Sequence, residues 1–352
     1  MLAGSINLDT IAAVHAVPGR DVSFVSEGYP AINVDLSDLS VDEKYFGSTH
    51  ALIRGVAAAV EKRGGKTGGF CANVSSNVFK GSGLSSSAAI EVLVGTIFNS
   101  LFNDDRFSTT DLSIMGQEAE NIHFGKPSGL MDQVACANGG IVEIDFRDPV
   151  KPVITPVGID FADFGYNLVI TTTGGNHADL TADYASIPSE MRSVARFFGR
   201  NALREVEPAQ FMARIGELRK ALGNDRAILR ASHYFQENYR VDCMVSALAE
   251  KDFGRYLSLV RSSGDSSFRY LQNIYSPKAA GEQGISLALA MTEMFLRDQG
   301  AFRVQGGGFA GTIEAYIPLE RTQDYFRHME SMFGEGCCTV LAIRNLPTMR
   351  VM

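Results

Sequence analysis

The sequence has no surplus of positive charge. Among its 352 residues, 32 Lys and Arg stand against 40 Asp and Glu, which gives a formal net charge of −8 at pH 7. The chain as a whole would repel a nucleic acid or an anionic membrane surface, so we expect neither as a partner. A phosphorylated ligand would have to be held by local N–H groups and a metal ion against this unfavourable field.

Long apolar runs are also lacking. No stretch reaches the ~20 residues that a helix needs to cross a bilayer. The N-terminus does not have the basic and then apolar order of a signal peptide. These two observations predict a soluble protein of the cytoplasm.

Cysteine and histidine are too few and too scattered to indicate a metal site. The sequence has 5 cysteines and 6 histidines, and neither set shows the paired spacing of metal ligands. Cys337 and Cys338 are adjacent, which makes them poor disulfide partners. We expect one of them to face a core from a strand.

The content of hydrophobic residues, 45%, is enough for a substantial core, and the length favours two domains. In the first half, short alternating or β-branched runs predict strands, and apolar residues at steps of three and four predict helices. The expected strands are 6–14, 22–26, 32–36, 68–78 and 139–144. The expected helices are 48–62, one directly behind residues 81–89, 109–123 and a short one that begins near 131.

The pattern changes near residues 161–166, where we place a boundary between domains 1–164 and 165–352. A strand at 168–173 is expected to lead through a loop into helices at 190–198, 209–222, 226–250, 254–271 and 281–296. Strands at 312–317 and 338–343 are expected on either side of a helix at 321–333. Strands and helices grouped in this way predict an α+β fold.

Residues 81–89 combine three features that suit a phosphate. Gly81 and Gly83 carry no Cβ that would obstruct a ligand, and the serines that follow supply hydroxyl groups. The helical pattern behind them would direct free N–H groups and the positive end of a helix dipole at one spot. A Ser-capped buried helix after a tight turn explains the same residues equally well.

Two further glycine-containing stretches follow residues 81–89 along the chain and help to interpret them. The three stretches are Gly81-Ser82-Gly83-Leu84-Ser85-Ser86-Ser87, Gly129-Leu130-Met131-Asp132-Gln133 and Gly306-Gly307-Gly308-Phe309-Ala310-Gly311. Together they resemble the GHMP small-molecule kinases, and the Met-Asp-Gln segment resembles the galactokinases most closely. The resemblance covers essentially the whole chain. It implies a two-domain α+β GHMP kinase fold with the active site in the cleft between the domains.

The resemblance implies how a nucleotide would be bound. The residues that would wrap the phosphates of ATP are Gly81, Ser82, Gly83, Leu84, Ser85, Ser86 and Ser87. Those that would bind Mg²⁺ are Ser86, Ser87 and Glu120, since a hard cation that bridges phosphates needs few protein oxygens.

The resemblance also implies a sugar site and a reaction. Asp132 matches the catalytic aspartate, which takes or orients the proton of the anomeric hydroxyl. The residues that would contact the sugar are Gly129, Asp132, Tyr184, Gly306 and Gly307. The implied activity is ATP- and Mg²⁺-dependent phosphorylation of galactose at its C1 hydroxyl, by a monomer or weak dimer. Taken alone, Asp132 would be explained as an acidic residue that complements a helix dipole.

The sequence departs from the family at its start. Galactokinases have a Gly-Glu-His-x-Asp motif whose side chains bind sugar hydroxyls, and no Glu-His-x-Asp occurs in this sequence. Residues 1–6 resemble the strand that follows that motif. We therefore expect the natural protein to extend upstream by a strand and a loop, with Met1 in place of a Val read from a GTG codon. Mass spectrometry of the native protein would test this expectation.

Smaller departures concern the nucleotide base and the second domain. The sequence contains no Trp, and Thr49 and Leu52 stand where the family has Trp-x-x-Tyr. The positions after Tyr184 lack the family's Arg pair, and Ala310 replaces a glycine. The contacts to adenine are therefore not predicted.

Two other functions fit the same residues. One is a GHMP kinase for another sugar, such as an amino sugar or a uronic acid. The other is a galactokinase-like regulator that binds sugar and nucleotide without catalysis, although Asp132, Glu120 and the three serines favour an enzyme. A coupled assay of ADP release across a panel of sugars would separate them.

Overall fold

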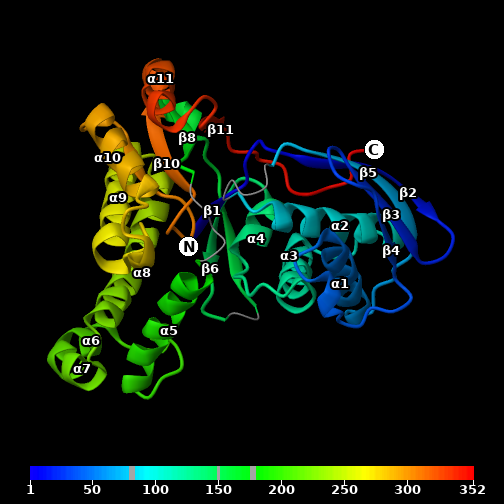
Figure 1. Ribbon diagram of the computed structural model, residues 1–352, viewed down its shortest axis with the longest axis horizontal. Coiled ribbons are helices and arrows are strands. Elements are labelled where there is room, and N and C mark those ends of the chain that lie inside the picture. The colour runs from blue at the N-terminus through cyan, green and yellow to red at the C-terminus, as the bar shows by residue number, and fades with distance from the viewer. Residues whose placement is uncertain (79–83, 149–150, 175–179) are drawn as a thin grey trace. The chain divides into compact units, whose positions relative to one another are not determined.

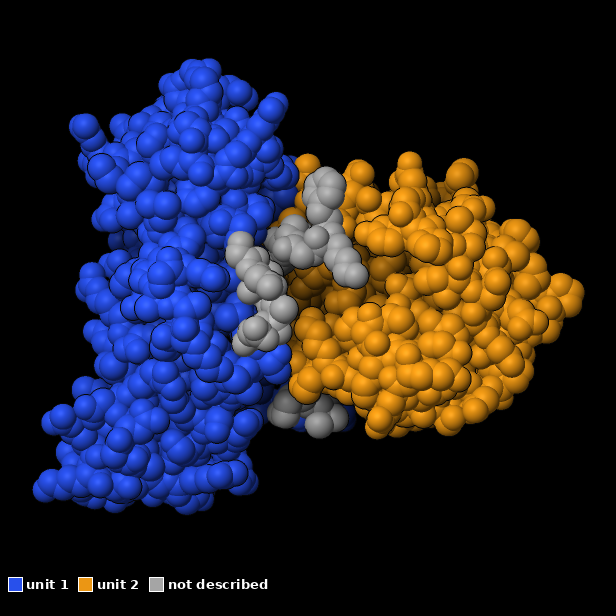
Figure 2. Space-filling model, viewed as in Figure 1, with its two compact units in different colours: residues 1, 145–152, 159–342 blue, residues 2–144, 153–158, 343–352 orange. Residues whose placement is uncertain are grey.

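The computed structural model describes residues 1–78, 84–148, 151–174 and 180–352. The chain divides into two compact units, which are coloured separately in Figure 2. Unit 2 consists of Leu2–Ile144, Val153–Gly158 and Ile343–Met352, and unit 1 of Met1, Asp145–Pro152 and Ile159–Ala342. Each unit is described by itself below.

Unit 2 mixes strands and helices, and Figure 1 labels β1 to β6 and α1 to α4 among them. Its elements are β1 (Leu2–Gly4), β2 (Thr10–Val17), β3 (Asp21–Ser26), β4 (Ile32–Asp35), η1 (Glu43–Tyr45), α1 (Thr49–Lys62), β5 (Gly69–Ser76), α2 (Ser86–Phe102), α3 (Thr109–Glu118), η2 (Ala119–Phe124), α4 (Met131–Asn138), β6 (Ile141–Asp145) and β7 (Val153–Val157).

A four-stranded sheet in the order β2-β5-β3-β4 forms one layer of unit 2. β3 and β5 run parallel, whereas β2 pairs with β5 and β4 with β3 in the antiparallel sense. Alternate residues of β3, Val22 and Phe24, are buried, as the period of two in a strand requires. They face a core that α1, α2 and α3 complete from one side of the sheet.

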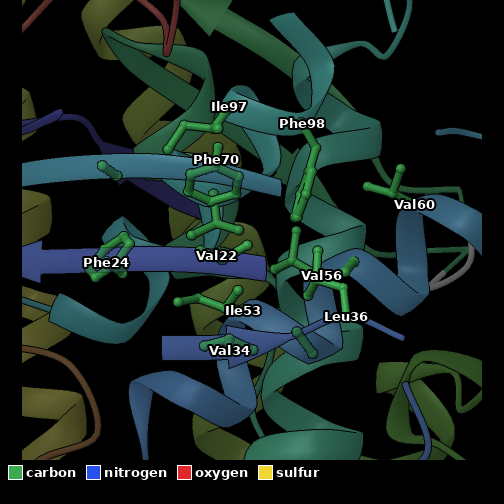
Figure 3. Packing of buried hydrophobic residues seen from close by; sticks show 14 of the residues in the cluster. Val22, Phe24, Val34, Leu36, Ile53, Val56, Val60, Phe70, Ile97 and Phe98 are labelled. Carbon is green, nitrogen blue, oxygen red and sulfur yellow. The ribbon is translucent and has the colours of Figure 1, made fainter. Parts of the chain in front are cut away.

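Figure 3 shows how this core is packed. The rings of Phe70 in β5 and Phe98 in α2 meet edge to face with centroids 5.5 Å apart. Val56 and Val60 of α1 are fully buried beside them. Burial of each such side chain contributes roughly 1.5–3 kcal/mol, so this sheet and its helices form a stable base for the segments that follow.

A second sheet of unit 2 has the order β1-β6-β7. Residues 343–352 return to this unit from the far end of the chain. Ile343 bridges to Ile6, the amide of Gly140 donates to the carbonyl of Arg344 at 2.6 Å, and the amide of Thr348 donates to the carbonyl of Ala137 at 3.0 Å. The last residues therefore support α4 and β6 directly.

Unit 1 is built on an antiparallel sheet in the order β11-β8-β10-β9. Its elements are η3 (Phe161–Phe164), β8 (Tyr166–Thr172), α5 (Thr181–Phe197), η4 (Leu203–Glu205), α6 (Pro208–Ala213), α7 (Ile215–Leu222), α8 (Asp225–Ala249), α9 (Phe253–Ser266), η5 (Ser267–Leu271), η6 (Pro277–Ala279), α10 (Gly284–Leu296), β9 (Ala301–Val304), β10 (Thr312–Pro318), η7 (Leu319–Arg321), α11 (Thr322–Phe333) and β11 (Cys338–Leu341). α10 and α11 bury apolar side chains with the sheet, among them Ile285, Ile317 and Tyr325.

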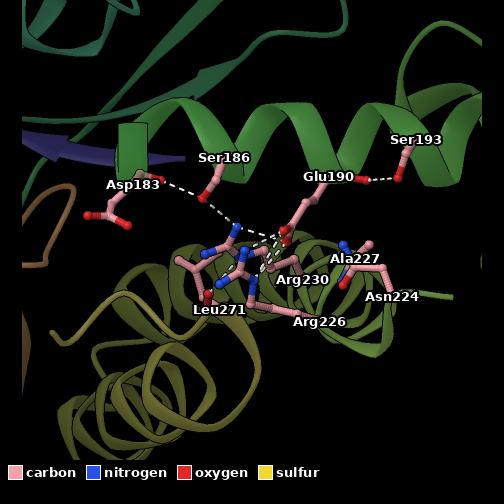
Figure 4. A network of polar contacts seen from close by, with 9 residues as sticks. All are labelled: Asp183, Ser186, Glu190, Ser193, Asn224, Arg226, Ala227, Arg230 and Leu271. Carbon is pink, nitrogen blue, oxygen red and sulfur yellow. Dashed lines mark hydrogen bonds and ion pairs between the residues drawn. The ribbon is translucent and has the colours of Figure 1, made fainter. Parts of the chain in front are cut away.

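The sequence-based prediction for α5 was wrong at its start. The pattern predicted a loop up to Glu190, yet the helix begins at Thr181 and continues through Pro188, which lacks an N–H group for the helical ladder. Arg230 of α8 donates to Ser186 Oγ and to Glu190 Oε2, each at 2.8 Å, on either side of the proline (Figure 4). These buried charge-assisted bonds offset the loss of one helical hydrogen bond.

Most other predicted elements are confirmed, and the differences are local. The predicted strand 6–14 begins only at Thr10, where pairing with β5 starts, and the predicted helix 209–222 is interrupted at Arg214. β7 and β9 were not predicted. Cys337 and Cys338 are buried free thiols, as expected. No helix within the described ranges is long and apolar enough to span a membrane.

Candidate active site

The N-terminus of α2 is the first part of the site. Ser85 precedes the helix in the left-handed conformation, with φ 55° and ψ 59°, and its side chain makes no capping hydrogen bond. Its hydroxyl donates instead to Oδ2 of Asp132. The first N–H groups of a helix have no partner within it, so this end of α2 offers donors beside a carboxylate. Gly81, Ser82 and Gly83 lie outside the described residues, and Leu84 and Ser86 flank Ser85.

Asp132 is held on α4, which begins one residue before it. Its neighbour one turn later, Cys136, is a free thiol whose pKa rises to about 12, first through burial and then through the charges of Asp132 and Glu91. A thiol with that pKa stays protonated near neutral pH, which makes it a poor nucleophile. Cys136 is therefore a weaker candidate for chemistry in this turn than Asp132.

Glu120 lies in η2, a π-helical turn that continues α3. Such turns re-aim side chains and are frequent at functional sites. Only 2% of Glu120 is exposed, and its Oε1 accepts a hydrogen bond of 2.9 Å from Ser87 Oγ and lies 3.1 Å from the Nζ of Lys126. Burial raises the pKa of Glu120, but hydrogen bonds from Ser128 and Ser87 and the charge of Lys126 outweigh it and leave the pKa below its ordinary value.

Close packing fixes where η2 lies. A Cβ atom on Gly55 of α1 would stand 2.7 Å from the Cβ and 2.8 Å from the Cα of Ala119. Only glycine allows α1 and η2 to approach this closely, so Gly55 sets the position of the turn that carries Glu120.

Gln133 joins two buried carboxyl groups. Its Nε2 donates to Oε2 of Glu91 at 2.9 Å and to Oε2 of Glu120 at 3.0 Å. Gln133 and Glu91 have no exposed surface. Burial first, and then the negative charge of Glu120, raise the pKa of Glu91 to about 8.

The donor set of Glu120 and Ser87 fits a magnesium ion. Both offer oxygen, which Mg²⁺ prefers, and the ammonium of Lys126 already places a positive charge at the same carboxylate oxygen. Within the described part of the chain, no cluster of three or more His, Cys, Asp or Glu could hold a metal alone. An ion here would need further ligands from a nucleotide and water.

The predicted sugar-binding residues of unit 1 come together around Tyr184 in α5. Its hydroxyl donates to the carbonyl of Gly308 at 2.8 Å, and its ring stands edge to face with Phe309 at 5.4 Å. A Cβ on Gly307 would lie 2.7 Å from the Tyr184 ring, so glycine is required there. Burial raises the pKa of the Tyr184 hydroxyl.

Asn273 shapes the glycine turn next to Tyr184. The amide of Phe309 donates to the Asn273 carbonyl at 2.5 Å, and the Asn273 side chain donates to the carbonyl of Gly307 at 3.1 Å. Gly306 has φ 63° and open space around it. Gly129 in unit 2 also has open space where a Cβ would lie, so its backbone is approachable.

Sequence reasoning missed Glu91, Lys126 and the bridging role of Gln133. Glu91 could have been noticed as the one charged residue of α2, whose other residues are mostly apolar. Lys126 gave no signal, since a contact between residues six apart in sequence depends on the π turn and on the left-handed Gly125 that ends it.

Comparisons with known proteins agree on the class. A model of the GHMP kinases N terminal domain matches residues 51–140. The crystal structure of Lactococcus lactis galactokinase in complex with galactose has the same fold, with a TM-score of 0.80 and 22% identity over 99% of this chain and 88% of that chain. The fold is thus that of a GHMP kinase.

Two relatives narrow the class to one family. A galactokinase of Actinobacillus pleuropneumoniae serotype 3 is 34% identical over 250 residues, which are 71% of this chain and 62% of the relative. A galactokinase of Mannheimia succiniciproducens is 33% identical over 276 residues, which are 77% of this chain and 68% of the relative. The chain belongs to the galactokinase family.

Proposed function

We propose that the protein transfers the γ-phosphoryl group of ATP to the anomeric hydroxyl of galactose. The matched region spans only 62% of the length of the Actinobacillus relative. The proposal is therefore argued from the residues of this chain's candidate site. The observation that carries the proposal is the double pairing at the start of α2, where Ser85 bonds to Asp132 and Ser87 to Glu120. The helix N-terminus suits the phosphates of ATP, and the two carboxylates beside it suit a base and a ligand for the accompanying cation.

Asp132 is the proposed base. It would take the proton of the C1 hydroxyl as the sugar oxygen bonds to the γ-phosphorus and the bond from that phosphorus to the bridging oxygen of ADP breaks. Phosphoryl transfer depends mainly on in-line positioning and neutralisation of charge, so the base has to manage only one proton. The hydrogen bond from Ser85 would hold the carboxylate in place for this step.

Glu120 and Ser87 are the proposed protein ligands of Mg²⁺, with Ser86 beside them at the first position of α2. A bound Mg²⁺ would supply positive charge to the phosphates. The proposed ATP contacts are Gly81, Ser82, Gly83, Leu84, Ser85, Ser86 and Ser87. The proposed sugar contacts are Gly129, Asp132, Tyr184, Gly306 and Gly307.

We propose the cytoplasm as the location, since ATP is available there and the five cysteines are free thiols, as in a reducing compartment. We further propose the domains 1–164 and 165–352 as the working halves of the enzyme, which would act as a monomer or weak dimer.

The test is an assay of ADP release with ATP, Mg²⁺ and a panel of sugars that includes galactose, galactosamine and galacturonate. Galactose should give the highest kcat/KM, and Asp132→Asn should lower kcat by roughly 10²–10⁴. Ser113→Ala, a buried hydroxyl change outside the proposed site, is the control. A higher kcat/KM for another sugar would contradict the assignment of galactose as the substrate. Near-normal turnover by Asp132→Asn would contradict the assignment of Asp132 as the base.

A further inference from the structure

Two buried oxygens next to the candidate metal ligand have no partner. Oε1 of Glu91 and Oε1 of Gln133 are buried and accept no hydrogen bond within the described residues. Both side chains belong to the same contact, because Gln133 Nε2 donates to the other oxygen of Glu91 at 2.9 Å. A buried oxygen without a donor costs ~1–3 kcal/mol, so two of them in one contact call for an explanation.

A single proton on Glu91 would satisfy both oxygens. An ionised carboxylate can only accept, and so can the oxygen of an amide, whereas a carboxylic acid donates through one oxygen and accepts through the other. An acid therefore pairs with an amide through two hydrogen bonds. In such a pair Oε1 of Glu91 would donate to Oε1 of Gln133, while the existing bond from Gln133 Nε2 to Glu91 Oε2 remains.

The Gln133 amide has a second N–H hydrogen, and it donates to Glu120. Nε2 of Gln133 carries two hydrogens, of which one faces Glu91 and the other faces Oε2 of Glu120 at 3.0 Å. The first bond fixes which way the amide points, and the second fixes the carboxylate of Glu120. Oε1 of Glu120 is then left for Ser87 and Lys126.

The surroundings agree with a neutral Glu91. Its pKa of about 8 results first from burial and then from the charge of Glu120, with Asp132 adding to the rise and the Gln133 bond and Lys126 opposing it. Gly116 of α3 covers the pair closely, since a Cβ there would lie 3.1 Å from the Cβ of Glu91 and 3.2 Å from the Cγ of Gln133. The contact is thus enclosed by packed atoms.

We propose that Glu91 is a positioning residue that bonds to Gln133 as a carboxylic acid and, through that amide, orients Glu120 for the metal–nucleotide complex. The value of this role for catalysis rests on the proposed function, but the geometry of the pair does not. Partners behind a metal ligand typically change affinity or activity by roughly 10–100-fold when they are removed.

Two substitutions test whether Glu91 acts as a neutral acid or as an ionised carboxylate. Glu91→Gln replaces the acid with an amide, which donates and accepts in the same way and restores both bonds to Gln133. Glu91→Leu keeps the approximate volume but leaves the amide of Gln133 free to turn. Ser113→Ala is the matched control, because Ser113 is also buried and donates to the backbone carbonyl of Gln133 at 3.2 Å without touching its amide.

The first readout is the Mg²⁺ concentration for half-maximal activity at fixed ATP and sugar. We expect Glu91→Leu to raise it about tenfold or more with a smaller change in the KM for the sugar, whereas Glu91→Gln and Ser113→Ala stay within about twofold of the wild type. An unchanged metal requirement in Glu91→Leu would overturn the proposal. So would a Glu91→Gln variant as impaired as Glu91→Leu, since an ionised Glu91 would then be needed.

The second readout does not depend on catalysis. In protein labelled with ¹⁵N-glutamine, the side-chain amide of Gln133, assigned from Gln133→Leu, should exchange its protons slowly in the wild type and in Glu91→Gln and fast in Glu91→Leu. If the wild type phosphorylates no sugar, the proposed function fails while this measurement still decides the pair. Fast exchange of that amide in the wild type would refute the pairing itself.

Discussion

Ser85 adopts a backbone conformation that residues other than glycine rarely adopt. Its φ of 55° places it in the left-handed region, which costs roughly 1 kcal/mol or more for a residue with a Cβ. The hydroxyl is used for Asp132 and not for capping the helix. Position 85 therefore carries a side chain at a cost in local stability, and that side chain bonds to the proposed base.

Ser85→Gly should accordingly separate stability from activity. Removal of the Cβ relieves the left-handed strain, so the free energy of unfolding in urea should stay level or rise by up to ~1 kcal/mol. The lost hydrogen bond to Asp132 should lower kcat by roughly tenfold. Asp104→Gly is the control, because Asp104 has φ 51° in an exposed turn. A Ser85→Gly enzyme with full kcat would remove Ser85 from the mechanism.

Lys126 occupies the carboxylate oxygen that the proposed metal would use. Its Nζ lies 3.1 Å from Oε1 of Glu120, although 63% of the lysine side chain is exposed. A solvated ion pair of this kind is worth ~0.2–1 kcal/mol, which sets the size of its competition with a cation. Lys126→Met should therefore lower the Mg²⁺ requirement by up to about fivefold in a titration at fixed ATP. A higher requirement would mean that Lys126 assists binding.

At the scale of elements, Gly55 governs the position of the turn that carries Glu120. Gly55→Ala would force a Cβ to within 2.8 Å of the backbone of Ala119, and such overpacking typically costs ~1–3 kcal/mol. We expect a lower midpoint of urea unfolding and a higher Mg²⁺ requirement together. Gly95→Ala in α2 is the comparison, since the atom nearest to its Cβ would be the tip of Leu112 at 3.3 Å, with Val56 Cγ1 at 3.8 Å. Equal metal requirements in both variants would contradict the role of Gly55.

The elements themselves could largely be predicted from the sequence, because their apolar spacing is regular. Ser48 caps α1 where the pattern began, and the predicted helix 226–250 is α8. Prediction failed where contacts with residues distant in the sequence determine the secondary structure. α5 passes through Pro188 because Arg230 from another helix ties both sides of the proline.

The candidate site could be predicted only in part, because some of its contacts join residues that are distant in the sequence. Asp132 stands in one of the three stretches that can be read along the chain, and Glu120 was predicted from the family resemblance. The links from Ser85 to Asp132 and from Gln133 to Glu91 join residues 47 and 42 positions apart, and only folding brings them together. Pairings of this kind leave no periodic trace in a single sequence.

For the whole molecule, Glu91 predicts a particular dependence of stability on pH. Its pKa is raised in the folded protein from 4.5 to about 8, so the folded state binds more protons across that window. Its stabilising contribution is complete below about pH 4.5 and is lost as pH rises through about 8. Glu91→Gln cannot titrate and should flatten this part of the curve by at most ~1.4 kcal/mol per pH unit.

The measurement is urea unfolding at a series of pH values from 5 to 9, with Ser113→Ala as a control that should keep the slope of the wild type. Equal slopes for the wild type and Glu91→Gln would show that Glu91 titrates alike in the folded and unfolded states. Glu120 does not affect this comparison of slopes, because its pKa is lowered from 4.5 and it therefore titrates below the range of pH 5 to 9.

The return of residues 343–352 to unit 2 has a consequence for biosynthesis. The backbone partners of Arg344 and Thr348 are Ser5, Gly140 and Ala137, which are made roughly 200 residues or more before them. At a typical 5–20 residues per second, the ribosome needs on the order of 10–40 s to travel the roughly 200 residues between Ile144 and Ile343. During that time α4, which bears Asp132, lacks its hydrogen bond to Thr348, so this part of the candidate site can be completed only after residues 343–352 have been made.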